Sequence, residues 1–269
     1  MNKICKIGRI LFIIVILLTF SSATFYSGDE KEEIVLATWN LGHFAKGKRS
    51  YSLVKSSELY DYSKKLRSII NDSIKPDVIC FNEYSVVLGV DSSNINQLTK
   101  DVIFYNFKRG KEGKQVGYSC NAIFSNKRIK RFEECSFESS KPFLKELPRA
   151  AAYYYLSSDL YISGSKVKLV CVHTTSGAPK VCQAQIAELI EKFDKVDKVI
   201  MCGDWNTQSY TRFKKAGYQL ANDGSYKTYP AKEWPLDNIV AKGVKISDVH
   251  VVKTDLSDHY PLVCKISLE

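Results

Sequence analysis

Side chains that can bind a metal ion or move a proton follow directly after short apolar segments at five places in this chain. The residues at these junctions are Trp39-Asn40, Asn82-Glu83, Val172-His173, Gly203-Asp204-Trp205-Asn206 and Ser257-Asp258-His259. Taken singly, each has a structural explanation: Asn40 can close a turn, Glu83 can be a surface acid and Asp204 can cap a helix. Carboxylates, amides and imidazoles are also the groups that bind Mg²⁺ and transfer protons. Because the arrangement recurs, we expect these side chains to share one catalytic site.

The apolar segments must be the elements that position these side chains. They are short and rich in β-branched residues, which predicts strands at residues 34–39, 78–81, 102–107, 122–124, 167–172, 198–202, 238–240 and 262–266. Apolar side chains recur at helical spacing in residues 52–71 and 181–193, and Pro179 precedes the second segment. Strands and helices in this number predict two packed sheets flanked by helices. Strand ends at one edge of a sheet hold catalytic side chains rigidly.

The first 23 residues have the pattern of a secretory signal peptide. Residues 1–9 contain three basic side chains and no acid, residues 10–20 form an apolar run, and small residues follow up to Ala23. A membrane span needs about 20 apolar residues, so this run is short for an anchor. We therefore expect cleavage near Ala23, a secreted or periplasmic protein, and a single mature domain at residues 24–269 without linker or internal repeat.

Charge and cysteine content set only broad limits on function. The chain has 39 Lys and Arg against 29 Asp and Glu, a net charge of +10, and loss of the three basic leader residues leaves +7 (10 − 3). A basic surface favours polyanions such as nucleic acid or anionic lipid headgroups, but it equally serves solubility. Removal of Cys5 leaves seven of the eight cysteines, an odd number. One disulfide bridge is compatible with this count, whereas a fold stapled by cysteines is not expected.

Motifs in a fixed order extend over the whole chain after the leader. They lie at residues 37–42, 76–83, 117–125, 149–151, 172–175, 203–206, 236–239 and 257–262. In type and order they resemble the endonuclease/exonuclease/phosphatase superfamily, which includes DNase I and the exonuclease III-type repair enzymes. The motifs at 203–206 and 257–262 are the most specific. The resemblance implies a four-layer α/β/β/α sandwich of the DNase I-like type, with two mixed sheets inside and helices outside.

The resemblance also implies a divalent metal site. Glu83 would be the principal Mg²⁺ ligand, with Asn40 and Asp258 completing or supporting the metal environment. A few hard oxygen donors, with water in the remaining positions, are what Mg²⁺ prefers. Mn²⁺ and Ca²⁺ are the alternative ions.

Proton transfer is assigned by the same resemblance to a second group of residues. His259 would face the phosphorus while Asp237 holds its ring, since a carboxylate on one ring nitrogen fixes the tautomer. Asp204 would orient or deprotonate the attacking water, and Asn206 would bind a non-bridging phosphate oxygen. Whether His259 or Asp204 removes the proton stays open.

Three further positions complete the expected site. His173 matches a position that is histidine in DNase I-like members and tyrosine in repair-type members, and either side chain can donate a hydrogen bond to the phosphate or leaving group. Arg149 resembles an arginine at a strand opening near the phosphate. Trp234 lies either at the mouth of the site or in a packing contact. For an acid that supports His173, Glu112 and Glu138 are the candidates.

Three functions are compatible with this pattern. The leading hypothesis is a secreted, metal-dependent phosphodiesterase, an endonuclease that hydrolyses DNA or RNA by in-line attack of water. The alternative is a phosphodiesterase or phosphatase acting on a lipid or small-molecule phosphoester, sphingomyelinase-like or inositol-phosphatase-like, because the same core serves both. An inert binding module would have lost part of the site, and all of it is present. No protein partner is indicated, and a monomer is the default.

Overall fold

The computed structural model describes residues 32–42, 56–87, 102–105 and 117–269. All of these residues belong to the unit Glu32–Glu269. The predicted leader, the start of the first predicted helix, the last two residues of the predicted strand 102–107 and Glu112 lie outside the described residues. Within the described ranges, no helix has the length and apolar character that a membrane crossing requires.

Two sheets form the middle of this unit. The first runs in the order β11 (Val244–Val251), β12 (Leu262–Leu268), β1 (Glu33–Asn40), β2 (Val78–Val87), β4 (Gly117–Ser125) and β3 (Val102–Tyr105). The second runs in the order β5 (Ile129–Ser136), β6 (Tyr154–Ile162), β7 (Ser165–His173), β8 (Val199–Asp204), β10 (Asp237–Lys242) and β9 (Gln219–Leu220). Each sheet is mixed, because β1–β2 and β7–β8 are parallel pairs among antiparallel neighbours.

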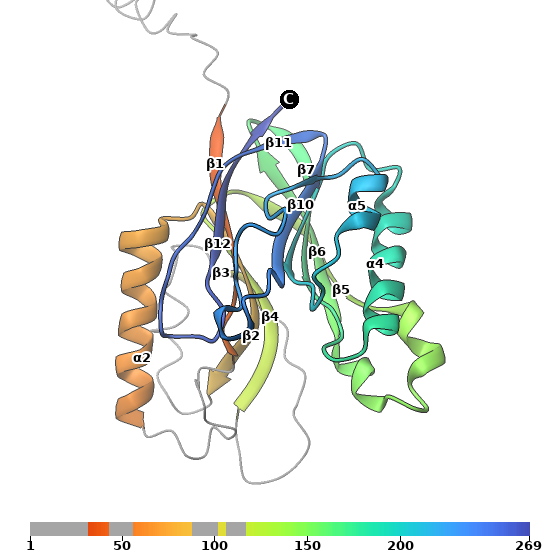
Figure 1. Cartoon of the computed structure of the whole chain (residues 1–269). Coiled ribbons are helices and arrows are strands. Elements are labelled where there is room, and N and C mark those ends of the chain that lie inside the picture. The colour runs from red at the N-terminus through yellow and green to blue at the C-terminus, as the bar shows by residue number, and fades with distance from the viewer. Residues whose placement is uncertain (1–31, 43–55, 88–101, 106–116) are drawn as a thin grey trace, which may run out of the picture. The chain divides into compact units, whose positions relative to one another are not determined.

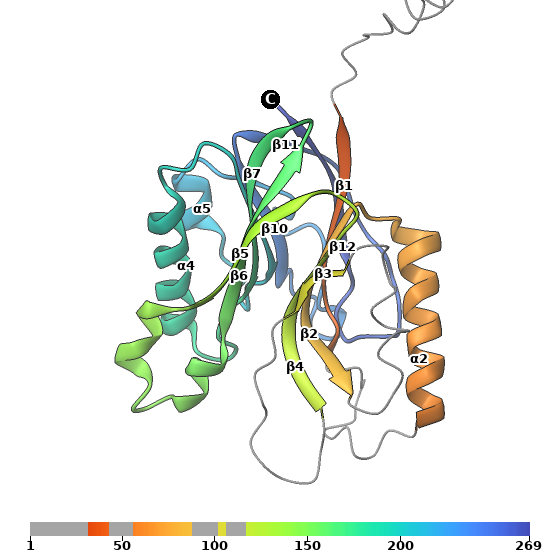
Figure 2. The ribbon, with the colours of Figure 1, turned by 180° about the vertical axis from the view of Figure 1, so that it is seen from behind.

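Helices cover the outer face of each sheet. Helix α2 (Ser56–Ser68), continued by the wider turn η3 (Ile69–Ile74), lies on the first sheet, and α4 (Pro179–Phe193) and α5 (Thr211–Lys215) lie on the second (Figures 1 and 2). The four layers confirm the predicted α/β/β/α sandwich. Pro179 is the first residue of α4, where its fixed φ suits a helix start.

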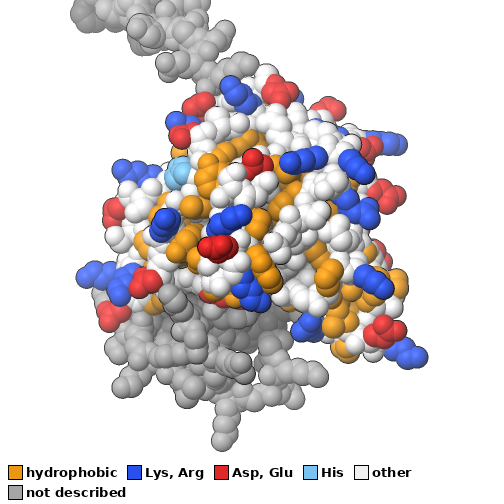
Figure 3. Space-filling view, viewed as in Figure 1, with side chains coloured by type: hydrophobic (Ala, Val, Ile, Leu, Met, Phe, Trp, Pro, Cys, Tyr) orange, Lys and Arg blue, Asp and Glu red, His pale blue; other side chains and the backbone are white. Residues whose placement is uncertain are grey.

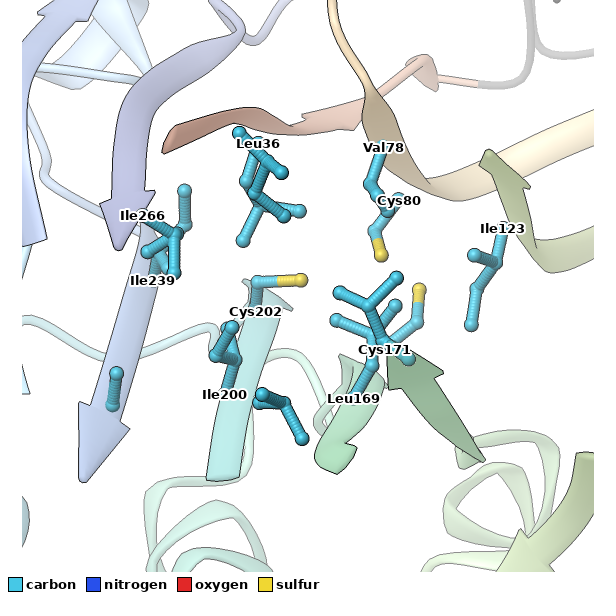
Figure 4. Packing of buried hydrophobic residues seen from close by; sticks show 14 of the residues in the cluster. Leu36, Val78, Cys80, Ile123, Leu169, Cys171, Ile200, Cys202, Ile239 and Ile266 are labelled. Carbon is cyan, nitrogen blue, oxygen red and sulfur yellow. The ribbon is translucent and has the colours of Figure 1, made fainter. Parts of the chain in front are cut away.

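A continuous apolar core lies between the two sheets. Figure 4 shows Leu36, Val78 and Cys80 of the first sheet facing Leu169, Cys171, Ile200 and Cys202 of the second. Strand β8 is buried along its whole length, with Ile200 in this core and Met201 packed toward the helices. Such two-sided burial explains its unbroken apolar sequence. The six cysteines with described side chains are free thiols, so no disulfide bridge forms among them.

Several strand predictions were incomplete. Strands β5, β6, β9 and β11 were missed, and β2 does not end at Phe81 but continues to Val87. Pairs of exposed residues separate single half-buried ones in β5, which lies at a sheet edge, so the alternation that indicates a strand is absent. In β6 the buried polar segment Ser157-Ser158-Asp159 interrupts the apolar pattern that would have predicted a strand. Asp159 is neutralised there by an ion pair with Lys168 of the neighbouring strand.

Candidate active site

The five predicted junctions meet at one edge of the sandwich. Parallel pairing places Asn40 beside Asn82 in the first sheet and His173 beside Asp204 in the second. Strand β10 runs antiparallel to β8, so its first residue, Asp237, also lies opposite Asp204.

A cavity of about 550 Å³ opens at this edge. Its lining residues are Asn40, Glu83, His173, Ser176, Gly177, Ala178, Pro179, Asp204, Asn206, Thr207, Gln208, Tyr229, Lys232, Trp234, Leu236, Asp258 and His259. A more open groove of about 770 Å³ lies between α4 and α5, but no residue of the predicted site lines it. Seven of the nine predicted site residues therefore line the cavity of 550 Å³, and Asp237 and Arg149 do not.

A bulge in β2 places Glu83 in the cavity. The pairing of β2 with β4 shifts register between Phe81 and Tyr84, and Glu83 has a φ of 51°. Successive side chains of a regular strand point to opposite faces, whereas a bulge re-aims them. Here it lets Asn82 reach the second sheet while Glu83 lines the cavity.

The buried amide of Asn82 ties the two sheets together beneath the cavity. Its Nδ2 donates to the Val172 carbonyl at 2.9 Å and to Asn121 Oδ1 at 2.8 Å, and its Oδ1 accepts the Asp204 N–H at 2.7 Å. This close approach requires Gly203, because a Cβ there would lie 1.8 Å from the Val172 carbonyl oxygen. Sequence reasoning gave Asn82 no role, since its partners lie far away in the chain.

Asp204 is the centre of the polar contacts. Its Oδ2 accepts a hydrogen bond from Asn40 Nδ2 at 2.9 Å and lies 3.7 Å from His173 Nε2 and 3.9 Å from His259 Nε2. Its Oδ1 accepts the Asn206 N–H at 2.8 Å. One buried carboxylate thus faces both catalytic imidazoles predicted from the sequence.

A carboxylate fixes the ring of His259. Its Nδ1 lies 2.7 Å from Asp237 Oδ2, which leaves Nε2 toward Asp204. The backbone is fixed as well, because the N–H donates to Ser257 Oγ at 3.0 Å and the carbonyl accepts from Trp39 Nε1 at 3.0 Å. The His259–Asp237 pair predicted from the resemblance is therefore present in the geometry of an oriented imidazole.

Burial and mutual charge shift the pKa values of this group. Burial disfavours the charged imidazolium of His259, but the carboxylates of Asp237, Asp204 and Asp258 outweigh it and raise its pKa to about 10. Burial raises the pKa of Asp204, repulsion by Asp237 adds to this, and the two imidazoles oppose it.

The three predicted metal ligands line the same cavity and offer oxygen donors. Asn40 Oδ1 accepts the Gly42 N–H at 2.9 Å, and a Cβ added at Gly42 would lie 2.4 Å from Asp258 Oδ1. The side-chain oxygens of Asn40 and Asp258 therefore both lie against Gly42, in a space that only glycine leaves open. Glu83 keeps 22% of its side chain exposed, so water has access to complete a coordination shell. This donor set fits a hard divalent ion such as Mg²⁺.

A second acidic group needs a different explanation. Ligand atoms of Asp204, Asp237 and His259 lie within 4.8 Å of one another, a spacing that could hold a metal ion. However, Asp237 and His259 contact each other at 2.7 Å, so their atoms are engaged in an imidazole–carboxylate pair. The oxygen donors of Asn40, Glu83 and Asp258, which line the cavity, are therefore the better fit to a hard divalent ion.

His173 is supported by acids that the sequence did not indicate. Its Nε2 lies 3.9 Å from Glu83 Oε1 and 3.7 Å from Asp204 Oδ2, and the ring of Tyr153 meets it edge-on at 5.0 Å. The suggestion of Glu138 was wrong, because that residue pairs with Lys141.

The position predicted for Arg149 is corrected. It lies in the short 3₁₀ turn η5 (Pro148–Ala152), before β6 begins, and its exposed guanidinium donates to the Ser176 carbonyl at 3.2 Å. Ser176 lines the cavity and Arg149 does not. Asn206, in contrast, does line the cavity, and its Nδ2 donates to the Thr174 carbonyl at 2.9 Å.

The sequence predicted little of the cavity lining that the turn before β10 contributes. Trp234, for which a packing role was an equal alternative, lines the cavity together with Tyr229 and Lys232. The ring of Tyr229 lies 4.9 Å from that of His259. Aromatic and basic residues directly before the Leu236-Asp237 motif were the available sequence signal.

Comparison with known proteins identifies the family. The model of the Endonuclease/Exonuclease/phosphatase family matches residues 37–259, which include every predicted site residue. The chain belongs to this family. Its members are phosphoric ester hydrolases and are generally metal-dependent, so the chain has a phosphodiesterase-like fold.

Similar curated proteins are UPF0294 proteins of Vibrio. The alignment to that of Vibrio cholerae is 31% identical over 146 residues, and that to Vibrio vulnificus is 29% identical over 144 residues. Each alignment covers 50% of this chain and 50% of the relative. The chain therefore matches about half the length of these relatives.

Solved structures share the fold at low sequence identity. An endonuclease/exonuclease/phosphatase from Beutenbergia cavernae has a TM-score of 0.69 at 15% identity, covering 88% of this chain and 72% of that one. TDP2 of D. rerio, solved in complex with a single-strand DNA product, has a TM-score of 0.58 at 17% identity, covering 88% of this chain and 99% of that one.

Proposed function

We propose that this protein is a secreted, Mg²⁺-dependent phosphodiesterase that cleaves DNA or RNA. The observation that carries the proposal is the position of Asp204 Oδ2, which lies 3.7 Å from His173 Nε2 and 3.9 Å from His259 Nε2, in a cavity that is also lined by the oxygen donors of Asn40, Glu83 and Asp258. We call Asn40, Glu83 and Asp258 the metal wall, which suits a metal-bound phosphate. We call Asp204 and His259, with Asp237 bonded to His259, the proton wall, which suits an attacking water and a proton.

The side chains of this cavity divide the work of hydrolysis. Asn40, Glu83 and Asp258 would hold the divalent ion, which when bound neutralises charge on the phosphate and stabilises the departing oxyanion. Asp204 would orient the water for in-line attack. His259, held by Asp237 through Nδ1, would hold or move a proton at Nε2, which lies 3.9 Å from Asp204 Oδ2.

Three other side chains would complete substrate binding. His173 Nε2, between Glu83 and Asp204, would donate to the phosphate or leaving group. Asn206 would bind a non-bridging oxygen. Arg149, which donates to the Ser176 carbonyl, would position the cavity lining at Ser176 from outside the cavity.

Charge and location favour a nucleic acid substrate. The net charge of +10, which is +7 (10 − 3) without the predicted leader, favours polyanions, and the predicted signal peptide would deliver the enzyme to extracellular nucleic acid. TDP2 of D. rerio, which shares the fold, was solved with a single-strand DNA product. Figure 3 shows Lys and Arg side chains spread over one face among Asp and Glu, so binding would depend on the cavity more than on one basic band.

Hydrolysis assays with the purified protein test this proposal. Plasmid DNA, RNA, sphingomyelin and inositol phosphates are incubated with Mg²⁺ or with EDTA, and His259→Ala is compared with His250→Ala, an exposed histidine outside the cavity. We expect nucleic acid cleavage that EDTA and His259→Ala abolish and His250→Ala leaves intact. Cleavage of only a lipid or small phosphoester would mean that this compound, and not nucleic acid, represents the substrate class. Inactivity on all four would contradict the enzymatic assignment.

A further inference from the structure

A tight turn forms one wall of the catalytic cavity. The Tyr229 N–H donates to the Trp234 carbonyl at 2.9 Å, and the Trp234 N–H donates to the Tyr229 carbonyl at 3.1 Å. Between them lie η6 (Pro230–Lys232) and Glu233, which has a φ of 55°. Because the Tyr229 ring packs on His259 at 4.9 Å, the turn is fixed beside the reaction centre.

This turn carries the positive charge of Lys232. Among the described residues that line the cavity, Lys232 is the sole lysine or arginine. Its Nζ lies 4.4 Å from the centre of the Trp234 ring, a cation–π contact that holds the ammonium at the cavity. No carboxylate of the described residues pairs with it. Among the described residues, the ammonium is thus open to an anion from outside.

Lys232 and the catalytic side chains differ in their exposure to solvent. Asp204 and His259 are 2% and 5% exposed, whereas Lys232 is exposed. A phosphate held by His173 and His259 would lie among buried or half-buried side chains, whereas Lys232 offers its charge on an exposed part of the same lining. A lysine is a point charge that suits a phosphate without demanding one orientation.

We infer that Lys232, held by Trp234, binds the phosphate next to the scissile one. Lys232 is then a specificity-determining residue, and the preferred substrate is a polynucleotide with phosphates on either side of the cleaved bond. A single phosphodiester uses the floor of the cavity alone. The inference rests on the proposed nuclease function and names its substrate class.

Two substrates that differ in the number of phosphates test this role. A thymidine dinucleotide has one phosphodiester, and an oligothymidylate has several of the same chemistry. Cleavage of both is measured with Mg²⁺ for the wild type, Lys232→Met, Lys232→Arg and Lys227→Met. Lys227 is the matched control, because it lies on the same loop, donates to the Gly224 carbonyl and does not line the cavity.

The expected result is a selective loss of binding. Lys232→Met should raise KM for the oligonucleotide roughly 3–10-fold with kcat unchanged, because a rim charge contributes to association. The slope of log KM against log salt should fall by about 0.7, the value for one single-strand phosphate contact. Lys232→Arg should restore most of the KM, Lys227→Met should match the wild type, and the dinucleotide should be cleaved equally by all four.

Tryptophan fluorescence gives a second readout that needs no activity. Trp39 and Trp205 are fully buried, so Trp234 is the accessible member of the three tryptophans. Oligothymidylate titrated in EDTA should change wild-type fluorescence, and Lys232→Met should weaken the apparent affinity in proportion to the KM.

The outcomes separate this inference from the function on which it rests. If the wild type cleaves neither the thymidine substrates nor RNA, the proposed function fails. If it cleaves the oligonucleotide but Lys232→Met and Lys227→Met behave alike, Lys232 has no such role. An equal loss on dinucleotide and oligonucleotide would place Lys232 at the reacting phosphate and would also overturn the inference.

Discussion

The two walls of the cavity differ in how far they exclude water. On the metal wall, Glu83 keeps 22% of its side chain exposed and Asp258 is half-buried. On the proton wall, the side chains of Asp237, Asp204 and His259 are 0%, 3% and 7% exposed. Asn40 is only 2% exposed, but Glu83 and Asp258 leave the metal wall partly open to solvent, whereas the proton wall is almost dry.

Each wall suits its expected task. A Mg²⁺ site needs room for water ligands, whereas a proton-transfer group gains from low polarity that strengthens each charge interaction. On the proton wall, Asp204 accepts hydrogen bonds from Asn40 and Asn206, and its own N–H donates to Asn82. Loss of a residue on the proton wall should therefore lower the rate, and loss of one on the metal wall should weaken metal binding.

Asp204→Asn should have the most severe effect. Removing its charge from between two imidazoles should lower kcat about 10²–10⁴-fold, the range for general acid–base groups. Turnover on an oligonucleotide at saturating Mg²⁺ measures this. Asp223→Asn, an exposed turn aspartate bonded to Ser225, is the control and should retain full activity. A kcat within about threefold of the wild type would show that Asp204 takes no part in the catalytic step.

Glu83→Gln should act on the metal instead. The substitution keeps the size of the side chain but removes a charged oxygen donor, so Mg²⁺ affinity should fall by at least about tenfold. Mg²⁺-dependent thermal stabilisation, followed by calorimetry, reports this without substrate. If the midpoint of that stabilisation is unchanged, Glu83 is not a ligand.

Sequence reasoning identified both walls because their residues follow buried strands in short motifs. It missed the features that depend on contacts across the chain. No sequence pattern indicates the bulge at Glu83, because the strand continues beyond it to Val87. Asn82 takes its role from hydrogen-bond partners in β7 and β8. Polar or edge strands such as β5 and β6 lack the apolar alternation that indicates a strand.

Asn82→Ala should affect both walls together. It leaves the Asp204 N–H and the Val172 carbonyl without their partner, which should lower the free energy of unfolding by about 1–3 kcal/mol. Thermal unfolding and kcat are measured side by side. Asn121→Ala is the matched control, because it lies in the same network without contacting Asp204. It should lose stability but retain more activity, and equal activity in the two variants would contradict a role in joining the walls.

Gly42→Ala should give the mildest change. Its φ of 54° is unfavourable for alanine and costs about 1 kcal/mol of stability. The new Cβ would displace Asp258 Oδ1, so the Mg²⁺ midpoint should rise while kcat at saturating Mg²⁺ is retained. Gly217→Ala, at a φ of 79° with open space around it, controls for the backbone cost and should leave the midpoint unchanged. A shift in both variants would exclude the contact with Asp258 as its cause.

The separation of the two walls can be tested in one titration. Single-turnover cleavage of an oligonucleotide is followed over a range of Mg²⁺ concentrations for the wild type, Glu83→Gln and Asp204→Asn. We predict that Glu83→Gln moves the midpoint to higher Mg²⁺ and approaches the wild-type plateau. Asp204→Asn should keep the midpoint and lose the plateau. A midpoint shift in Asp204→Asn as large as that in Glu83→Gln would show that the walls do not act separately.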